Sequence, residues 1–196
     1  NSMITIVGAG PAGSYLGYLL TKQGKKVIIL EEHNAVGNPV QCTGIVTHSI
    51  EEFLKLKNEV IAKKLDKVIV VSKNNKIEVN VDEIVMWRNK FDKFVANISE
   101  GAGAEILLEH KFLGFNGRNS IKVRDKKNNR IKEIKTEIIV GADGPYSDVA
   151  KAAGMNSNSK NYIGMQAKVK LKIGQNAFET HFGHEFPDFF GWVVPE

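Results

Sequence analysis

A glycine-rich turn near the start of the chain constrains its fold more than any other feature. Residues 4–7 (ITIV) predict a short buried strand, and Gly8, Gly10 and Gly13 follow it in the spacing G-x-G-x-x-G. Leucines at helical spacing come next, and residues 27–30 (VIIL) predict a second buried strand. This order of strand, glycine turn, helix and strand is typical of a dinucleotide-binding unit in a parallel sheet.

The residue types in this stretch fit a diphosphate and a ribose. Gly8 permits the tight turn, Gly10 lets the backbone approach a diphosphate, and Gly13 allows close packing of helix and strand. The free N–H groups of the first helical turn favour the diphosphate. Glu31 follows at about 20 residues, where its carboxylate can accept both ribose hydroxyls of an adenosine and would repel a 2′-phosphate. The stretch therefore predicts an adenine dinucleotide site, disfavours NADP, and leaves FAD and NAD as alternatives.

Residues 141–147 (GADGPYS) carry a second signal of the same kind. They follow a predicted buried strand at 138–140, and Asp143 stands between Gly141 and Gly144. Its carboxylate can bind ribityl or ribose hydroxyls, or it can cap the helix that follows. Because this turn is expected at the same sheet edge as the first one, the two together favour FAD.

Composition and the lone cysteine exclude several other functions. The 196 residues carry a net charge of +5 from lysines spread along the chain. The densest basic segment, residues 124–130, has no aromatic residues that would stack on bases, so we expect no nucleic-acid partner. Cys42 has no second cysteine to pair with, and His181 and His184 should point to opposite faces of an extended segment, so we expect no disulfide and no metal.

Other patterns along the chain predict an α/β fold. Helices are expected at residues 47–57 and 89–100, a third parallel strand at 106–108, and a β-meander from three strands at 112–115, 121–124 and 131–134. Further strands are expected at residues 68–71, 77–81 and 164–173.

Several of these motifs resemble a known flavoprotein family. GAGPAG at 8–13, Glu31, Arg88 in W-R-x-x-F-D and GADGPYS at 141–147 resemble the FAD domain of the group that includes p-hydroxybenzoate hydroxylase. Within that group, P-V-Q-C-T-G at 39–44 and P-x-x-F-G-W-x-x-P at 187–195 are most similar to the geranylgeranyl reductases. The resemblance implies a flavoenzyme that saturates isoprenoid double bonds, whose archaeal relatives act on membrane-lipid precursors.

The resemblance also implies a domain organisation. It assigns residues 3–66 and 88–160 to a Rossmann-like FAD-binding domain, a parallel sheet with a β-meander. Residues 67–87 and 161–196 would form part of an antiparallel-sheet substrate domain. Relatives continue past Pro195 through a third FAD-contacting motif, so we expect this sequence to be truncated at its C-terminus.

Site roles follow from the same resemblance. The implied cofactor-binding residues are Gly8, Gly10, Ala12, Gly13, Glu31, Glu32, Cys42, Arg88, Gly141, Asp143 and Gly144. Cys42, the one candidate catalytic residue, would lie near the isoalloxazine ring, although it could also be a small buried hydrophobic residue. Phe190, Trp192 and Pro195 would line the substrate channel, the alternative for Trp192 being simple packing under the sheet.

We therefore expect an FAD-dependent reductase of geranylgeranyl lipids. Its electron donor would be external, a ferredoxin-like protein or NAD(P)H, and we expect a cytoplasmic protein open to peripheral membrane contact. Two alternatives stay open: an FAD-dependent monooxygenase or halogenase, and an inactive FAD-binding fragment.

Overall fold

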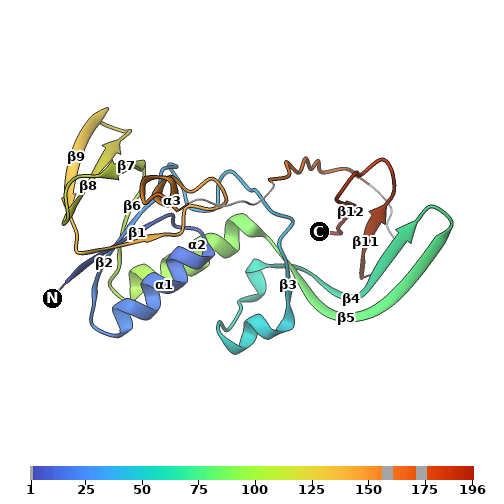
Figure 1. The fold of residues 1–196 in the computed structure, drawn as a ribbon. Helices are drawn as coiled ribbons and strands as arrows, with labels where there is room; N and C mark the ends of the chain where they lie inside the picture. The colour runs from blue at the N-terminus through green and yellow to red at the C-terminus, as the bar shows by residue number, and fades with distance from the viewer. Residues whose placement is uncertain (1, 156–160, 171–175) are drawn as a thin grey trace. The chain divides into compact units, whose positions relative to one another are not determined.

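The computed structural model describes residues 2–155, 161–170 and 176–196. Contacts divide the chain into two compact units, each formed from two separate segments. The first unit comprises Asn1–Val40 and Phe91–Gly164, and the second comprises Gln41–Lys90 and Met165–Glu196. Figure 1 labels the helices and strands of both units.

The first unit is built on a parallel sheet with the strand order β10-β1-β2-β6. Its strands are β1 (Met3–Val7), β2 (Lys26–Leu30), β6 (Glu105–Leu107) and β10 (Ile138–Gly141). The two central strands, β1 and β2, are rich in branched apolar residues because other elements of the unit cover both of their faces. The predicted third parallel strand is confirmed as β6.

Two helices cover one face of this sheet. They are α1 (Pro11–Lys22) and α2 (Arg88–Gly101), most of which belongs to this unit, and Figure 1 shows them side by side. Gly17 permits this packing, because a Cβ atom there would lie 2.6 Å from Cδ1 of Ile29 and 2.7 Å from Oγ of Ser99. No helix in the described part of the chain combines the length and the hydrophobicity that a membrane crossing needs.

A three-stranded antiparallel sheet covers the other face. It consists of β7 (His110–Phe115), β8 (Ser120–Asp125) and β9 (Arg130–Lys135), which confirms the predicted meander. Its inward side chains pack with those of β1, β2 and the short helix α3 (Asp148–Ala152). The buried residues of this core are Val7, Leu30, Phe112, Ile121, Val123 and Val149.

The second unit contains a five-stranded sheet with the order β12-β11-β4-β5-β3. Its strands are β3 (Ile45–Thr47), β4 (Ile61–Ser72), β5 (Asn75–Met86), β11 (Ala177–Phe182) and β12 (Gly191–Val193). All neighbouring pairs are antiparallel except β4 and β11, which are parallel. The two predicted strands at 68–71 and 77–81 are thus the part next to the turn of a much longer hairpin.

Two predicted elements of this unit are wrong, and one boundary shifts. In place of a helix over 47–57, the chain forms two short 3₁₀ helices, η1 (His48–Glu52) and η2 (Asn58–Val60). Residues 164–170 have no regular structure, and residues 171–173 of that predicted strand lie outside the described residues. The predicted first domain included residues 41–66, but these group with the second unit because β3 and β4 both pair with β5.

Candidate functional site

The glycine turn after β1 is held so tightly that only glycine fits at two positions. Gly8 has a φ of +104°, and a Cβ atom there would lie 2.3 Å from the carbonyl oxygen of Ala142. A Cβ atom on Gly13 would lie 2.0 Å from the carbonyl oxygen of Gly8. The turn is therefore packed against the chain that leaves β10, as close strand–helix packing requires.

Gly10 differs from these two because it faces open space. Apart from Gly10 and its two chain neighbours, no residue of the described structure has an atom within 4 Å of where its Cβ would be, and its φ of −63° is accessible to any residue. Gly10 is the N-cap of α1, no side chain caps that helix, and Pro11 begins it. The first-turn N–H groups, including that of the exposed Ala12, are consequently available to an external acceptor. This open cradle fits a diphosphate.

Glu31 stands at the carboxyl end of β2 and braces the turn. Its side chain is buried, and Oε2 accepts a hydrogen bond of 3.1 Å from the N–H of Ala9. Oε1 accepts one of 2.9 Å from the N–H of His33, whose ring Nδ1 lies 2.6 Å away. A carboxylate has about four acceptor positions, so Oε2 keeps capacity for a ligand hydroxyl. His33 was not among the predicted site residues, and only its place two residues after Glu31 pointed to this contact.

The second turn lies directly beside the first. The N–H of Ala142 donates to the carbonyl of Val7 at 2.8 Å, and Gly141 pairs with Val7 in the sheet. Parallel pairing thus brings the two predicted motifs to one sheet edge. Gly144 has a φ of +81° and is exposed, which fits a backbone turn open to a ligand.

Asp143 also performs the capping role that was its alternative interpretation. Its Oδ1 accepts a hydrogen bond of 2.6 Å from the hydroxyl of Ser147, and its Oδ2 accepts one of 3.1 Å from the N–H of Val149. Ser147 in turn caps α3 by accepting from the N–H of Ala150 at 2.9 Å. Asp143 is therefore held in place, with acceptor positions left over for hydroxyl groups.

Cys42 and Arg88 belong to the second unit, where one glycine brings their segments together. The thiol of Cys42 is exposed and accepts a hydrogen bond of 3.5 Å from the N–H of Gly44, so it is not a buried hydrophobic residue. Gly44 has a φ of +84°, and a Cβ atom there would lie 2.5 Å from the carbonyl oxygen of Met86 and 3.0 Å from Cγ of Arg88.

The sheet of the second unit has one apolar face, which the strand register defines. Trp192 pairs with Thr180, Thr180 with Val70, and Val70 with Ile77, so these side chains share a face. The next row continues it with Phe178, Val68 and Val79. We call these seven residues the apolar face. The opposite face carries charge, with Glu78 and Glu179 on either side of Ile69.

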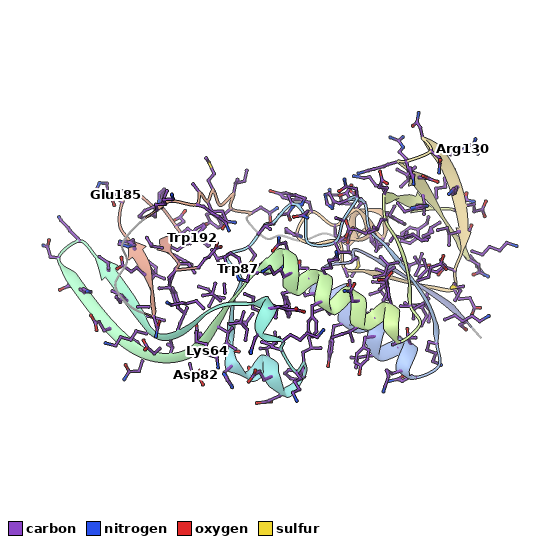
Figure 2. The ribbon with its side chains drawn as sticks, turned by 180° about the vertical axis from the view of Figure 1, so that it is seen from behind. Lys64, Asp82, Trp87, Arg130, Glu185 and Trp192 are labelled. Atoms are coloured by element: carbon purple, nitrogen blue, oxygen red, sulfur yellow. The ribbon has the colours of Figure 1, made fainter. Side chains whose placement is uncertain are left out.

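Aromatic rings extend the apolar face at β12. The ring of Phe190 meets that of Trp192 edge-on at 6.2 Å, and Phe190 stacks on Phe189 at 4.5 Å (Trp192 is labelled in Figure 2). Phe182 completes this cluster, 5.6 Å from Phe190. Pro195 lies just beyond β12 and is half-buried. Phe190 and Trp192 thus lie together. Phe178, Phe182 and the valines of the face were not among the predicted substrate residues.

No three His, Cys, Asp or Glu side chains of the described ranges gather as metal ligands would.

Comparison with known proteins gives a consistent picture. A family model described as FAD binding domain matches residues 1–189. Digeranylgeranylglycerophospholipid reductase 3 of Methanosphaera stadtmanae is 30% identical over 98% of this chain and 53% of its own length. The digeranylgeranylglycerophospholipid reductase of Methanocaldococcus jannaschii is 30% identical over 98% of this chain and 52% of its own length. The chain thus spans about half the length of the curated reductases it matches.

Solved structures show the same fold. A geranylgeranyl bacteriochlorophyll reductase-like protein from Thermoplasma acidophilum superposes with a TM-score of 0.84 at 23% identity, covering 99% of this chain and 53% of that protein. The myxobacterial chondrochloren halogenase CndH superposes with a TM-score of 0.71 at 16% identity, covering 99% of this chain and 50% of that one. At these identities the likeness establishes the fold that the chain shares with both proteins.

Proposed function

Because this chain belongs to the FAD binding domain family, we propose that it supplies the flavin site of a reductase that saturates double bonds of geranylgeranyl chains in membrane lipids. The observation that carries the proposal is the pair of turns at one sheet edge, one open over Gly10 and the other ordered by Asp143. Curated reductases of such lipids are about 30% identical to the chain over 98% of its length.

The residues of the first unit would hold the cofactor as follows. The turn from Gly8 to Gly13, with the N–H of Ala12, would bind the diphosphate, and Glu31 the adenosine ribose. Asp143, between Gly141 and Gly144, would bind the ribityl side. When bound and reduced, FAD would supply a hydride equivalent to one carbon of the double bond, and a proton would add to the other carbon. Electrons would reach it from an external donor, of ferredoxin or NAD(P)H type.

The apolar face of the second unit suits an isoprenoid chain. Its residues offer aromatic and branched aliphatic surface, and the neighbouring charged side chains of Lys76, Glu78 and Glu179 point to the opposite side. Each methylene group that leaves water for such a surface contributes about 0.8 kcal/mol to the binding free energy. A charged side chain against the lipid would lose its water and gain no hydrogen bond, because a hydrocarbon chain has no polar atoms. We propose that Phe190, Trp192 and Pro195 bind the lipid together with this face. The flavin-contacting roles of Arg88 and Cys42 stay predictions from the family resemblance.

Mass spectrometry of an anaerobic reaction tests the proposal. The FAD-loaded protein, chemically reduced, is incubated with a geranylgeranylated lipid, and the product should gain two hydrogen atoms for each saturated bond. The variant Val70→Asp, which places a carboxylate on the apolar face, should slow the reaction by at least about tenfold, because an apolar chain cannot solvate a charge.

Val71→Asp is the matched control, since Val71 pairs with Lys76 on the opposite, charged face. It should react like the wild type. An unchanged lipid mass with the wild-type protein, or oxygen consumption that depends on the lipid, would contradict the reductase proposal. Equal loss in both valine variants would contradict the assignment of the apolar face.

A further inference from the structure

One lysine of the first unit bridges two acidic residues that come from different elements. Nζ of Lys111, on β7, lies 3.2 Å from Oε2 of Glu32 and 3.6 Å from Oδ2 of Asp148. Glu32 is the second residue after the end of β2, and Asp148 is the first residue of α3. Figure 1 shows α3 close to β7, and Val149 and Phe112 pack in one core.

One bridged residue is the chain neighbour of a residue in the candidate flavin site, and the other is the chain neighbour of a residue bonded to that site. Glu32 follows Glu31, and Asp148 precedes Val149, whose N–H is bonded to Asp143. β7 is also fixed to Glu31 itself, because the N–H of His110 donates to the carbonyl of Glu31 at 2.8 Å. A single ammonium group therefore links the ends of the two segments that carry Glu31 and Asp143.

We infer that Lys111 is a positioning residue for flavin binding: it holds the carboxyl end of β2 and the start of α3 at the separation that lets Glu31 and Asp143 bind one cofactor. This inference rests on the proposed function. Without the ammonium group, Glu32 and Asp148 would be two like charges close enough to repel each other. The separation would then relax, and both acids would bind their hydroxyl groups less well.

The charge states support this role. The hydrogen bond to Glu32 raises the pKa of Lys111, so the ammonium form is favoured. Burial opposes ionisation of Glu32, but Lys111 and Lys126 together outweigh it and lower the pKa of this carboxyl group. Both shifts favour the charged forms of Lys111 and Glu32, the closer of the two ion pairs. All three side chains are partly exposed, so the bridge should weaken in high salt.

Lys126 provides a matched control. Its Nζ lies 3.3 Å from Oε2 of Glu32, comparable to that of Lys111, and it is equally exposed. Among the described residues, its ion-pair partner is Glu32 and it forms no bridge to Asp148. Replacing Lys126 removes a positive charge beside Glu32 without breaking a link between the two elements.

FAD titration of the apoprotein at low and high salt tests the inference. Lys111→Met should raise the Kd for FAD about three- to tenfold at low salt, and the ratio to wild type should approach one in 1 M salt. Lys111→Arg should restore most of the affinity, and Lys126→Met should stay within about twofold of wild type. Asp148→Asn should weaken binding less when Lys111 is already Met than in the wild-type background.

Equal effects of Lys111→Met and Lys126→Met would overturn the inference, as would a loss that salt does not change. The thermal midpoint of each apoprotein shows whether a variant has merely lost stability. If the wild-type protein fails to bind FAD, the proposed function fails; if it binds FAD and Lys111→Met binds equally well, only this inference fails.

Discussion

Gly10→Ala is expected to deprive the protein of FAD while leaving the apoprotein folded. Apart from its two chain neighbours, the added methyl group would meet no described residue within 4 Å, so it would project into the open space over the first turn of α1. A diphosphate could no longer approach the N–H groups there, and each lost hydrogen bond to a charged group is worth about 1.5–3 kcal/mol. We expect the Kd for FAD to rise about 10- to 100-fold or more.

Two measurements separate this effect from unfolding. Alanine is a poorer N-cap than glycine, so urea denaturation should show a loss of about 1 kcal/mol or less. Gly13→Ala is the contrasting variant, because its methyl group would lie 2.0 Å from a backbone oxygen and should cost stability and FAD binding together. FAD affinity of Gly10→Ala equal to that of wild type would show that the diphosphate lies elsewhere.

Glu31→Gln is expected to weaken FAD binding to a similar degree and to destabilise the apoprotein as well. The amide keeps one acceptor oxygen, so it cannot accept from the N–H groups of both Ala9 and His33 as the carboxylate does. A buried donor left unpaired costs about 1–3 kcal/mol. The neutral side chain also loses the charge-assisted bonds to ribose hydroxyls, which should raise the Kd for FAD about 10- to 100-fold.

Fluorescence titration with FAD and urea denaturation measure these two effects. Glu105→Gln is the control, because Glu105 is an exposed acid on β6, the neighbouring strand, and should change neither quantity. The ribose assignment would be wrong if Glu31→Gln lost stability but bound FAD as tightly as the wild type.

The elements that the sequence predicted well are those whose pattern is local. The turn from Gly8 to Gly13 has fixed spacing, and the meander has alternating apolar residues between turns at residues 116–117 and 128–129. Asp143 could be read in two ways, and the structure shows why, since its carboxylate caps α3 at the same sheet edge that holds the glycine turn.

The errors come from positions that distant contacts decide. Residues 47–57 have helical apolar spacing, yet Phe53 is 65% exposed and Leu54 is buried, because the chain here runs between β3 and β4, which are both bound to β5. The lysines at 63, 64 and 67 interrupt the apolar pattern of β4, so the pattern predicted only its last part as a strand. Lys111 contacts Glu32 and Asp148, which are far from it in the sequence. His33 contacts Glu31 nearby, but no sequence pattern marks that contact. No spacing rule could therefore predict either one.

The most direct test of the account is an equilibrium titration of the folded wild-type protein with FAD, followed by the absorbance and fluorescence of the flavin. We expect saturable one-to-one binding that Gly10→Ala weakens about 10- to 100-fold or more and that NAD cannot replace. A folded protein that leaves the flavin spectrum unchanged throughout the titration would contradict it.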